Sequence, residues 1–129
     1  PIKVFNHGNM SRDFTYVGDI VEGMIQVMEK SNFLQNNKGK YSNNFQLFNI
    51  GANKPIQLLD FIETMEDVFE KRAIKEMYPM QPGDVETTYA DVSELMDKFN
   101  YRPDTSLEEG LSKFAKWYQS YFRKEVFQQ

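Results

Sequence analysis

The sequence predicts a mixed α/β fold in which short strands alternate with about four helices. Apolar residues recur at helical spacing in the longer helical stretches, and two stretches begin with a capping box, which is a typical helix start. Short runs of β-branched and aromatic residues between these stretches are typical of strands. The length of 129 residues fits one domain, so we expect a single region spanning 1–129.

The N-terminal elements are predicted from a spacing that changes from strand-like to helical. Residues 2–6 alternate and favour a strand, and residues 7–9 are turn-forming. The β-favouring run 14–17 is expected to pair with the first strand as a loose hairpin. From Val17 onward the apolar residues fall at helical spacing, which predicts a helix over 18–30.

The middle of the chain is predicted to contain a loop, a strand and an amphipathic helix. Residues 31–44 are rich in Asn, Lys, Ser and Gly without periodicity, which is typical of a loop. Residues 45–51 form an apolar run that ends at a glycine, which favours a mostly buried strand. An apolar stripe predicts a helix over 57–71, whose opposite, solvent-facing side carries Asp60, Glu63, Glu66, Asp67 and Glu70.

The last part of the chain is predicted to hold two strands and two helices. Strands are expected over 74–78 and 85–90, on either side of an irregular loop that contains two prolines. A capping box at 91–94 predicts a short helix that ends near Lys98. A second capping box at 106–109 predicts a long amphipathic helix that ends near Lys124.

The composition excludes several classes of function. The chain has no cysteine, which excludes disulfides, thiolate catalysis and Cys-based metal sites, and its one histidine excludes a multi-histidine metal site within a single chain. The net charge of −4 disfavours a general nucleic-acid binder. No apolar run approaches the roughly 20 residues that span a bilayer, and no leader pattern is visible. We therefore expect a cytoplasmic protein with no nucleic-acid or membrane partner.

Several catalytic motifs are missing from the sequence. None of its seven glycines stands at the G-x-G or G-x-x-G spacing of a phosphate-binding glycine loop. No tyrosine is followed by a lysine four residues later, and no serine lies in a nucleophile elbow. The sequence therefore predicts neither a dinucleotide site nor a catalytic residue in this chain.

The stretch Gly8–Asp19 is the most informative segment for binding. It places one cation, Arg12, between turn residues and aromatic residues, just before a predicted helix. An arginine in a tight loop near a helix start is suited to binding an anion such as phosphate. A solvated surface arginine is the alternative that these residues leave open.

Four motifs follow one another along the chain: Arg-Asp-Phe-Thr-Tyr-Val-x-Asp-Ile-Val-x-Gly at 12–23, Phe-Asn-Ile-Gly at 48–51, Met-Gln-Pro-Gly-Asp-Val at 80–85 with Tyr-Ala-Asp at 89–91, and Thr-Ser-Leu-Glu-Glu-Gly-Leu-x-x-Phe-x-x-Trp-Tyr at 105–118. In this order they resemble the motifs of the extended short-chain dehydrogenase family of nucleotide-sugar epimerases, and most resemble those of the bacterial UDP-glucuronate 4-epimerases. Together they cover essentially all of the chain.

This resemblance implies that residues 1–129 are the C-terminal UDP-sugar-binding region of such an enzyme, with its N-terminal Rossmann domain absent. In the family that domain carries the glycine loop, NAD and the Tyr-x-x-x-Lys pair. NAD is thus expected in the full-length parent but not on this chain, which is expected to be inactive alone. Without that domain, apolar faces of 18–30 and 45–51 would be uncovered, which predicts an exposed patch or a homo-oligomer.

The resemblance also implies three substrate-binding residues. Arg12 corresponds to the arginine that binds the pyrophosphate, and Asp84 to the carboxylate that accepts hydrogen bonds from the ribose. Gln81 stands where galactose-type epimerases have a second phosphate-binding arginine, and glutamine there favours the glucuronate-type branch. A turn carboxylate is the alternative for Asp84, and a plain surface residue is the alternative for Gln81.

Three functions follow from these observations. The first is the UDP-sugar-binding part of a 4-epimerase that converts UDP-glucuronate to UDP-galacturonate. The second keeps the family but changes the reaction to that of a sugar-nucleotide dehydratase or decarboxylase. The third is a non-enzymatic interaction module that uses a surface rich in Met and Phe, and it predicts that UDP leaves Arg12 and Asp84 unaffected.

Overall fold

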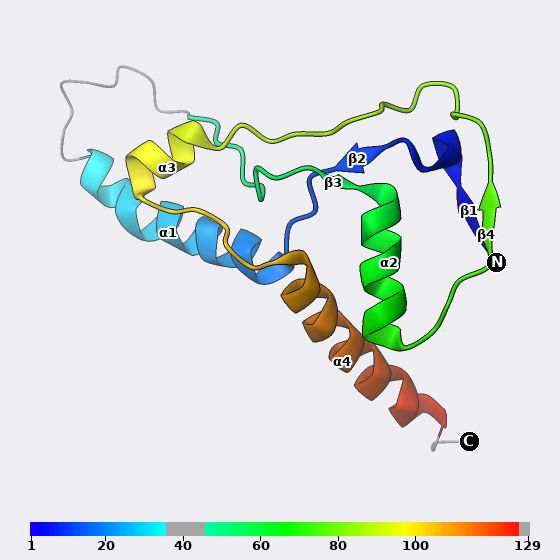
Figure 1. Ribbon diagram of the computed structural model, residues 1–129. Coiled ribbons are helices and arrows are strands. Elements are labelled where there is room, and N and C mark those ends of the chain that lie inside the picture. The colour runs from blue at the N-terminus through cyan, green and yellow to red at the C-terminus, as the bar shows by residue number, and fades with distance from the viewer. Residues whose placement is uncertain (36–45, 127–129) are drawn as a thin grey trace. The chain divides into compact units, whose positions relative to one another are not determined.

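The computed structural model describes residues 1–35 and 46–126, and within these ranges it is the mixed α/β fold that the sequence predicts (Figure 1). Its elements are β1 (Ile2–Val4), a 3-10 helix η1 (Phe5–Gly8), β2 (Ser11–Arg12), α1 (Val17–Gln35), β3 (Ile56–Gln57), α2 (Leu58–Phe69), β4 (Lys75–Met77), α3 (Ser93–Phe99) and α4 (Leu107–Val126). None of the helices in these ranges combines the length and apolar character needed to cross a bilayer.

The elements form two compact units whose segments alternate along the chain. The first unit contains Pro1–Arg12, Ile56–Thr88 and Thr105–Gln129, and the second contains Asp13–Pro55 and Tyr89–Asp104.

The strands of the first unit pair with distant segments instead of with their neighbours. β1 lies parallel to β4, with Val4 opposite Met77, and β2 lies antiparallel to β3. The predicted hairpin between 2–6 and 14–17 is therefore wrong. The chain turns through η1, where Asn6 and His7 adopt left-handed backbone angles, so β1 is left to pair with β4.

Helices α2 and α4 form the main helical contact of the first unit, and both match the predicted helices closely. Ile62 of α2 and Ala115 of α4 are buried. The ring of Phe69 packs edge-on against Phe114 at 6.4 Å between centroids. The predicted second capping box is supported by the Ser106 hydroxyl, which accepts the hydrogen bond of the Glu109 N–H at 3.1 Å.

One residue of the predicted solvent face of α2 is buried. Glu66 is only 5% exposed at its side chain, and its carboxylate accepts hydrogen bonds from Lys75, Arg72 and the Ala73 N–H. The helical pattern places Glu66 opposite the apolar stripe, but the chain that follows α2 folds back over it. The carboxylate thereby joins the end of α2 to β4.

The second unit is built around α1 and α3, and its core lies on α3. Leu95 is completely buried, and Val92 and Phe99 are nearly so. Phe48 packs edge-on against Phe99 at 5.1 Å between ring centroids. The predicted capping box at 91–94 is wrong, because the N-cap of α3 is Val92 and no side chain caps the helix there. The Asp91 carboxylate instead accepts the hydrogen bond of the Ser93 N–H at 3.0 Å, two residues further along the chain.

Three predictions of regular structure were wrong in part. α1 continues to Gln35, so residues 31–35 are helical and not a loop, since a helix once formed extends readily through residues of modest propensity. Residues 36–44 of that predicted loop lie outside the described residues. Residues 46–50 of the predicted strand 45–51 form no strand, and residue 45 lies outside the described residues; the Asn49 side chain donates to the Asp91 carbonyl at 3.1 Å. In 85–90 only one isolated bridge forms, between Thr87 and Ser11.

The predicted apolar surface is present on α1. Its exposed apolar residues are Val17, Val21, Met24, Ile25 and Met28, and Leu47 in the following segment is also exposed. Self-association through this surface stays a prediction, which light scattering over a dilution series would test.

Asp13 organises the second unit by accepting hydrogen bonds from three backbone N–H groups. Its Oδ2 accepts from Asn53 at 3.1 Å and from Ala90 at 3.0 Å, and its Oδ1 accepts from Lys54 at 3.4 Å. Gly51 lies beside this carboxylate and is buried. Backbone segments that are far apart in sequence thus meet at one side chain.

We expect Gly51→Ala to destabilise the second unit by about 1–2 kcal/mol, because the site has no room for a methyl group. An added Cβ would lie 2.5 Å from the Ala90 Cβ and 3.1 Å from the Asp13 carboxylate. Urea denaturation followed by circular dichroism would measure the loss. Gly18→Ala is the matched control, since the three atoms nearest to its methyl belong to the outer part of the Tyr16 side chain and not to a carboxylate that joins backbone segments. Equal effects of the two variants would contradict the steric explanation.

Candidate functional site

The site predicted from sequence is built around β2, whose first residue is anchored on both sides. The Ser11 N–H donates to the Glu86 carbonyl at 2.8 Å, and the Thr88 N–H donates to the Ser11 carbonyl at 3.2 Å. The buried Ser11 hydroxyl donates to the Thr87 hydroxyl at 2.9 Å. These bonds hold the segment 86–88 beside β2 and fix the backbone from which Arg12 extends.

Arg12 and Asp84 lie in direct contact although 72 positions separate them. Nη2 of Arg12 donates to Oδ1 of Asp84 at 2.9 Å. Nη1 donates to the carbonyls of Ser11 at 2.9 Å and Glu86 at 3.1 Å. The structure therefore brings together two of the three residues that the sequence singled out.

Asp84 lies in a turn that begins at Gln81. The Asp84 N–H donates to the Gln81 carbonyl at 3.2 Å, and the Val85 N–H donates to Oδ1 of Asp84 at 2.9 Å. Gly83 adopts φ +84°, a conformation that favours glycine, with open space around it. The side chain of Gln81 is exposed, and its backbone carbonyl links it to Asp84 in the same turn.

The pair is accessible to solvent and to ligands. The side chain of Arg12 is 24% exposed and that of Asp84 is 33% exposed. Ion pairs at such exposure contribute little to stability, typically about 0–1 kcal/mol. A guanidinium at this position can bind an anion, and the neighbouring carboxylate can accept hydrogen bonds from hydroxyl groups.

Ser11 and Thr87 are positioning residues that the sequence did not indicate. Both are short hydroxyl side chains with no motif of their own, and their contact depends on the fold. The only signal in the sequence was the position of Ser11 immediately before Arg12.

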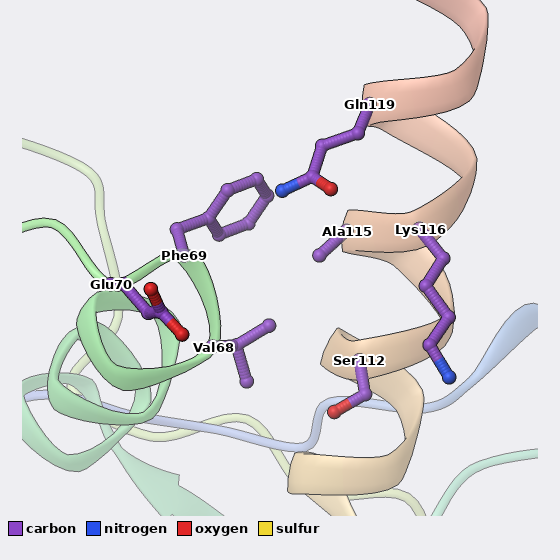
Figure 2. A pocket seen from close by; sticks show the side chains of 7 residues that line it. All are labelled: Val68, Phe69, Glu70, Ser112, Ala115, Lys116 and Gln119. Atoms are coloured by element: carbon purple, nitrogen blue, oxygen red, sulfur yellow. The ribbon is translucent and has the colours of Figure 1, made fainter.

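A separate shallow groove lies between the end of α2 and the middle of α4 (Figure 2). Its volume is about 410 Å³, and its lining residues are Val68, Phe69, Glu70, Ser112, Ala115, Lys116 and Gln119. Figure 2 shows the Ser112 and Lys116 side chains on α4 and the Phe69 ring on α2. None of the residues predicted to bind substrate lines this groove, so it is distinct from the Arg12–Asp84 pair.

The described residues form no cluster of histidine, aspartate and glutamate that could hold a metal ion. They also do not fit a dinucleotide. The paired strands in these ranges form two two-stranded sheets, and no glycine-rich turn leads from a strand into a helix there.

The comparisons with known proteins agree on one family. The family model described as GDP-mannose 4,6 dehydratase matches residues 2–114. Protein CapI of Staphylococcus aureus is 38% identical over 130 residues, covering 95% of this chain and 39% of that protein. A probable UDP-glucuronate 4-epimerase of Rhizobium meliloti is 34% identical over 132 residues, covering 96% of this chain and 39% of that protein.

A solved structure has the same fold. The UDP-glucuronic acid 4-epimerase from Bacillus cereus, in complex with UDP-glucuronic acid and NAD, matches with a TM-score of 0.68 and 29% identity. The match covers 86% of this chain and 32% of that one. The chain thus spans about two fifths of the length of the curated relatives named above. Since the family model covers nearly all of it, the chain belongs to the nucleotide-sugar epimerase and dehydratase family that the GDP-mannose 4,6 dehydratase model describes.

Proposed function

We propose that this chain is the UDP-sugar-binding C-terminal region of a nucleotide-sugar 4-epimerase of the UDP-glucuronate to UDP-galacturonate type. The names of the relatives from Rhizobium meliloti and Bacillus cereus support this substrate class. The observation that carries the proposal is the contact between Arg12 and Asp84, because the family resemblance assigned both residues to one nucleotide.

Each residue of the site has a distinct task in this proposal. The guanidinium of Arg12 binds the diphosphate, since it keeps its charge and matches phosphate oxygens with two parallel hydrogen bonds. The carboxylate of Asp84 accepts hydrogen bonds from the ribose hydroxyls. The side-chain amide of Gln81 donates to a phosphate oxygen. Binding the nucleotide in this way helps to hold the distant sugar in place for the reaction.

The chemical step belongs to a part of the complete protein outside this chain. The described residues do not fit NAD, so we assign NAD and the catalytic pair to an N-terminal Rossmann domain of the full-length parent. The partners proposed for the chain are a UDP-sugar, that domain and further copies of the complete protein.

The proposal is tested by comparing UDP with uridine in an NMR titration of the chain. UDP is expected to shift the side-chain resonances of Arg12 and the backbone amide of Val85, because the diphosphate meets the guanidinium beside that turn. Uridine lacks the diphosphate and is expected to cause no saturable shift. Equal responses to both ligands would contradict the proposal.

The chain alone is expected to show no epimerase activity. Incubation with UDP-glucuronate and added NAD, followed by NMR of the sugar, should leave the substrate unchanged. Formation of UDP-galacturonate would contradict our placement of the chemical step outside this chain.

A dehydratase or decarboxylase of the same family is the second candidate. The matching family model is itself named for a dehydratase, which favours this alternative. Product analysis of the complete protein would distinguish them, since an epimerase conserves the mass of the sugar nucleotide and the other two reactions lower it. A non-enzymatic module is the third candidate, and a missing response of Arg12 and Asp84 to UDP would favour it.

A further inference from the structure

Asp84 accepts a hydrogen bond from the terminal nitrogen of Arg12 that a bidentate anion would use. A guanidinium has five N–H donors, two of them on each terminal nitrogen. The Nη1 donors go to the carbonyls of Ser11 and Glu86, and Nη2 goes to Asp84. A bidentate anion needs two neighbouring donors, so with Nη1 engaged it must use Nη2.

We propose that Asp84 is the resident counter-ion of Arg12, and that a nucleoside diphosphate binds by displacing it. This inference rests on the proposed function, since it assumes that the diphosphate binds at Arg12. The displaced carboxylate then becomes the acceptor for the ribose hydroxyls of the same ligand. One ion pair is exchanged for two ligand contacts, and no protein charge is left without a partner.

This exchange makes Asp84 a specificity-determining residue. A bare phosphate or pyrophosphate also takes Arg12 from Asp84, but it offers the carboxylate no hydroxyl group in return. The displaced carboxylate then faces another anion nearby, which is unfavourable because like charges repel. A nucleoside diphosphate meets the same repulsion, but the hydrogen bonds that its ribose hydroxyls donate to the carboxylate offset part of it, so the pair favours a nucleoside diphosphate over free phosphates.

The local structure allows Asp84 to move without disturbing Arg12. The segment 86–88 is held to β2 by the backbone and hydroxyl bonds of Ser11, independently of the ion pair. The other bond of the Asp84 carboxylate comes from Val85 in the same turn. Gly83 has open space around it, so the turn has room to change. The Arg12–Asp84 ion pair is therefore not needed to hold the segment 86–88 beside β2.

Calorimetric titration of the full chain with inorganic pyrophosphate and with UDP tests the inference. In Asp84→Asn, pyrophosphate is expected to bind about three- to tenfold tighter than in the unaltered chain, because Arg12 loses its competing charge. UDP is expected to show no such gain, because the weaker competition is offset by the loss of the ribose acceptor. Asp97→Asn, an exposed site on α3, is the charge-matched control and should change neither affinity.

A second variant tests the same inference if Asp84→Asn does not fold. Asp84→Ser keeps a side-chain oxygen for the Val85 N–H and is expected to show the same gain in pyrophosphate affinity. Unchanged or weaker pyrophosphate binding in both variants, with UDP binding still dependent on Arg12, would overturn the inference and leave the proposed function intact. UDP binding that does not depend on Arg12, or no binding of either ligand, would overturn both.

Discussion

Arg12→Gln is expected to weaken UDP binding by about tenfold to a hundredfold. Hydrogen bonds to charged groups contribute roughly 1.5–3 kcal/mol each, and glutamine removes both the charge and the paired donors. The glutamine also leaves Asp84 without its counter-ion, which adds repulsion against the incoming diphosphate. Calorimetric titration with UDP measures the change directly.

Two further variants make the Arg12 result interpretable. Arg12→Lys keeps the charge but not the two parallel donors, so its affinity is expected to lie between those of the unaltered chain and Arg12→Gln. Arg102→Gln removes an exposed arginine of the second unit and should leave UDP affinity unchanged. If Arg12→Gln keeps both its fold and its affinity for UDP, Arg12 does not bind the nucleotide.

Glu66→Gln is expected to lower the melting temperature by roughly 5 °C or more at pH 7. The carboxylate accepts hydrogen bonds from Lys75 at 2.5 Å and from the Ala73 N–H at 2.9 Å, and Arg72 adds a third. Glutamine cannot neutralise Lys75 and replaces one acceptor with a donor. The link between α2 and β4 is thereby weakened, which a thermal melt followed by circular dichroism measures.

The effect of Glu66 is also expected to depend on pH. The hydrogen bond from Lys75, followed by those from Ala73 and Arg72, lowers the pKa of Glu66 from its ordinary value of 4.5 to about 2. A carboxyl group with a lowered pKa in the folded state stabilises the fold above its unfolded pKa. That stabilisation is lost as the pH falls from about 4.5 to about 2. The difference in melting temperature between the unaltered chain and Glu66→Gln should therefore become smaller as the pH falls through this range.

Glu63→Gln is the matched control for Glu66, since it removes an exposed carboxylate from the same helix. Its melting temperature should stay close to that of the unaltered chain at every pH. If the difference in melting temperature between Glu66→Gln and the unaltered chain stays constant down to pH 2, the stabilisation does not come from the charge of the carboxylate.

The long helices were predictable because their signals are local. The apolar stripe that predicted 57–71 and the capping box that predicted the last helix act between residues a few positions apart. α2 and α4 accordingly lie where the sequence indicated. The end of α1 was less predictable, because residues 31–35 carry only weak local preferences.

The strand pairing was not predictable because it depends on partners far along the chain. Residues 2–4 pair with β4 and not with their neighbours, and residues 46–50 form no strand, although their apolar run favours one. The burial of Glu66 was not predictable for the same reason. The helical pattern shows only which side of α2 it occupies, and not which later segment covers that side. Its partner Lys75 comes from the strand that follows the helix.

The order of motifs in the sequence alone indicated the family and named Arg12, Gln81 and Asp84 as the residues to examine. The roles expected of these three residues come from the resemblance to the family, which is carried by short motifs along the chain. Only the tertiary structure decided that the side chains of Arg12 and Asp84 meet each other, while Gln81 is joined to Asp84 through its backbone carbonyl. The physical reason is that Ser11 holds the segment 86–88 beside β2 through hydrogen bonds between distant parts of the chain.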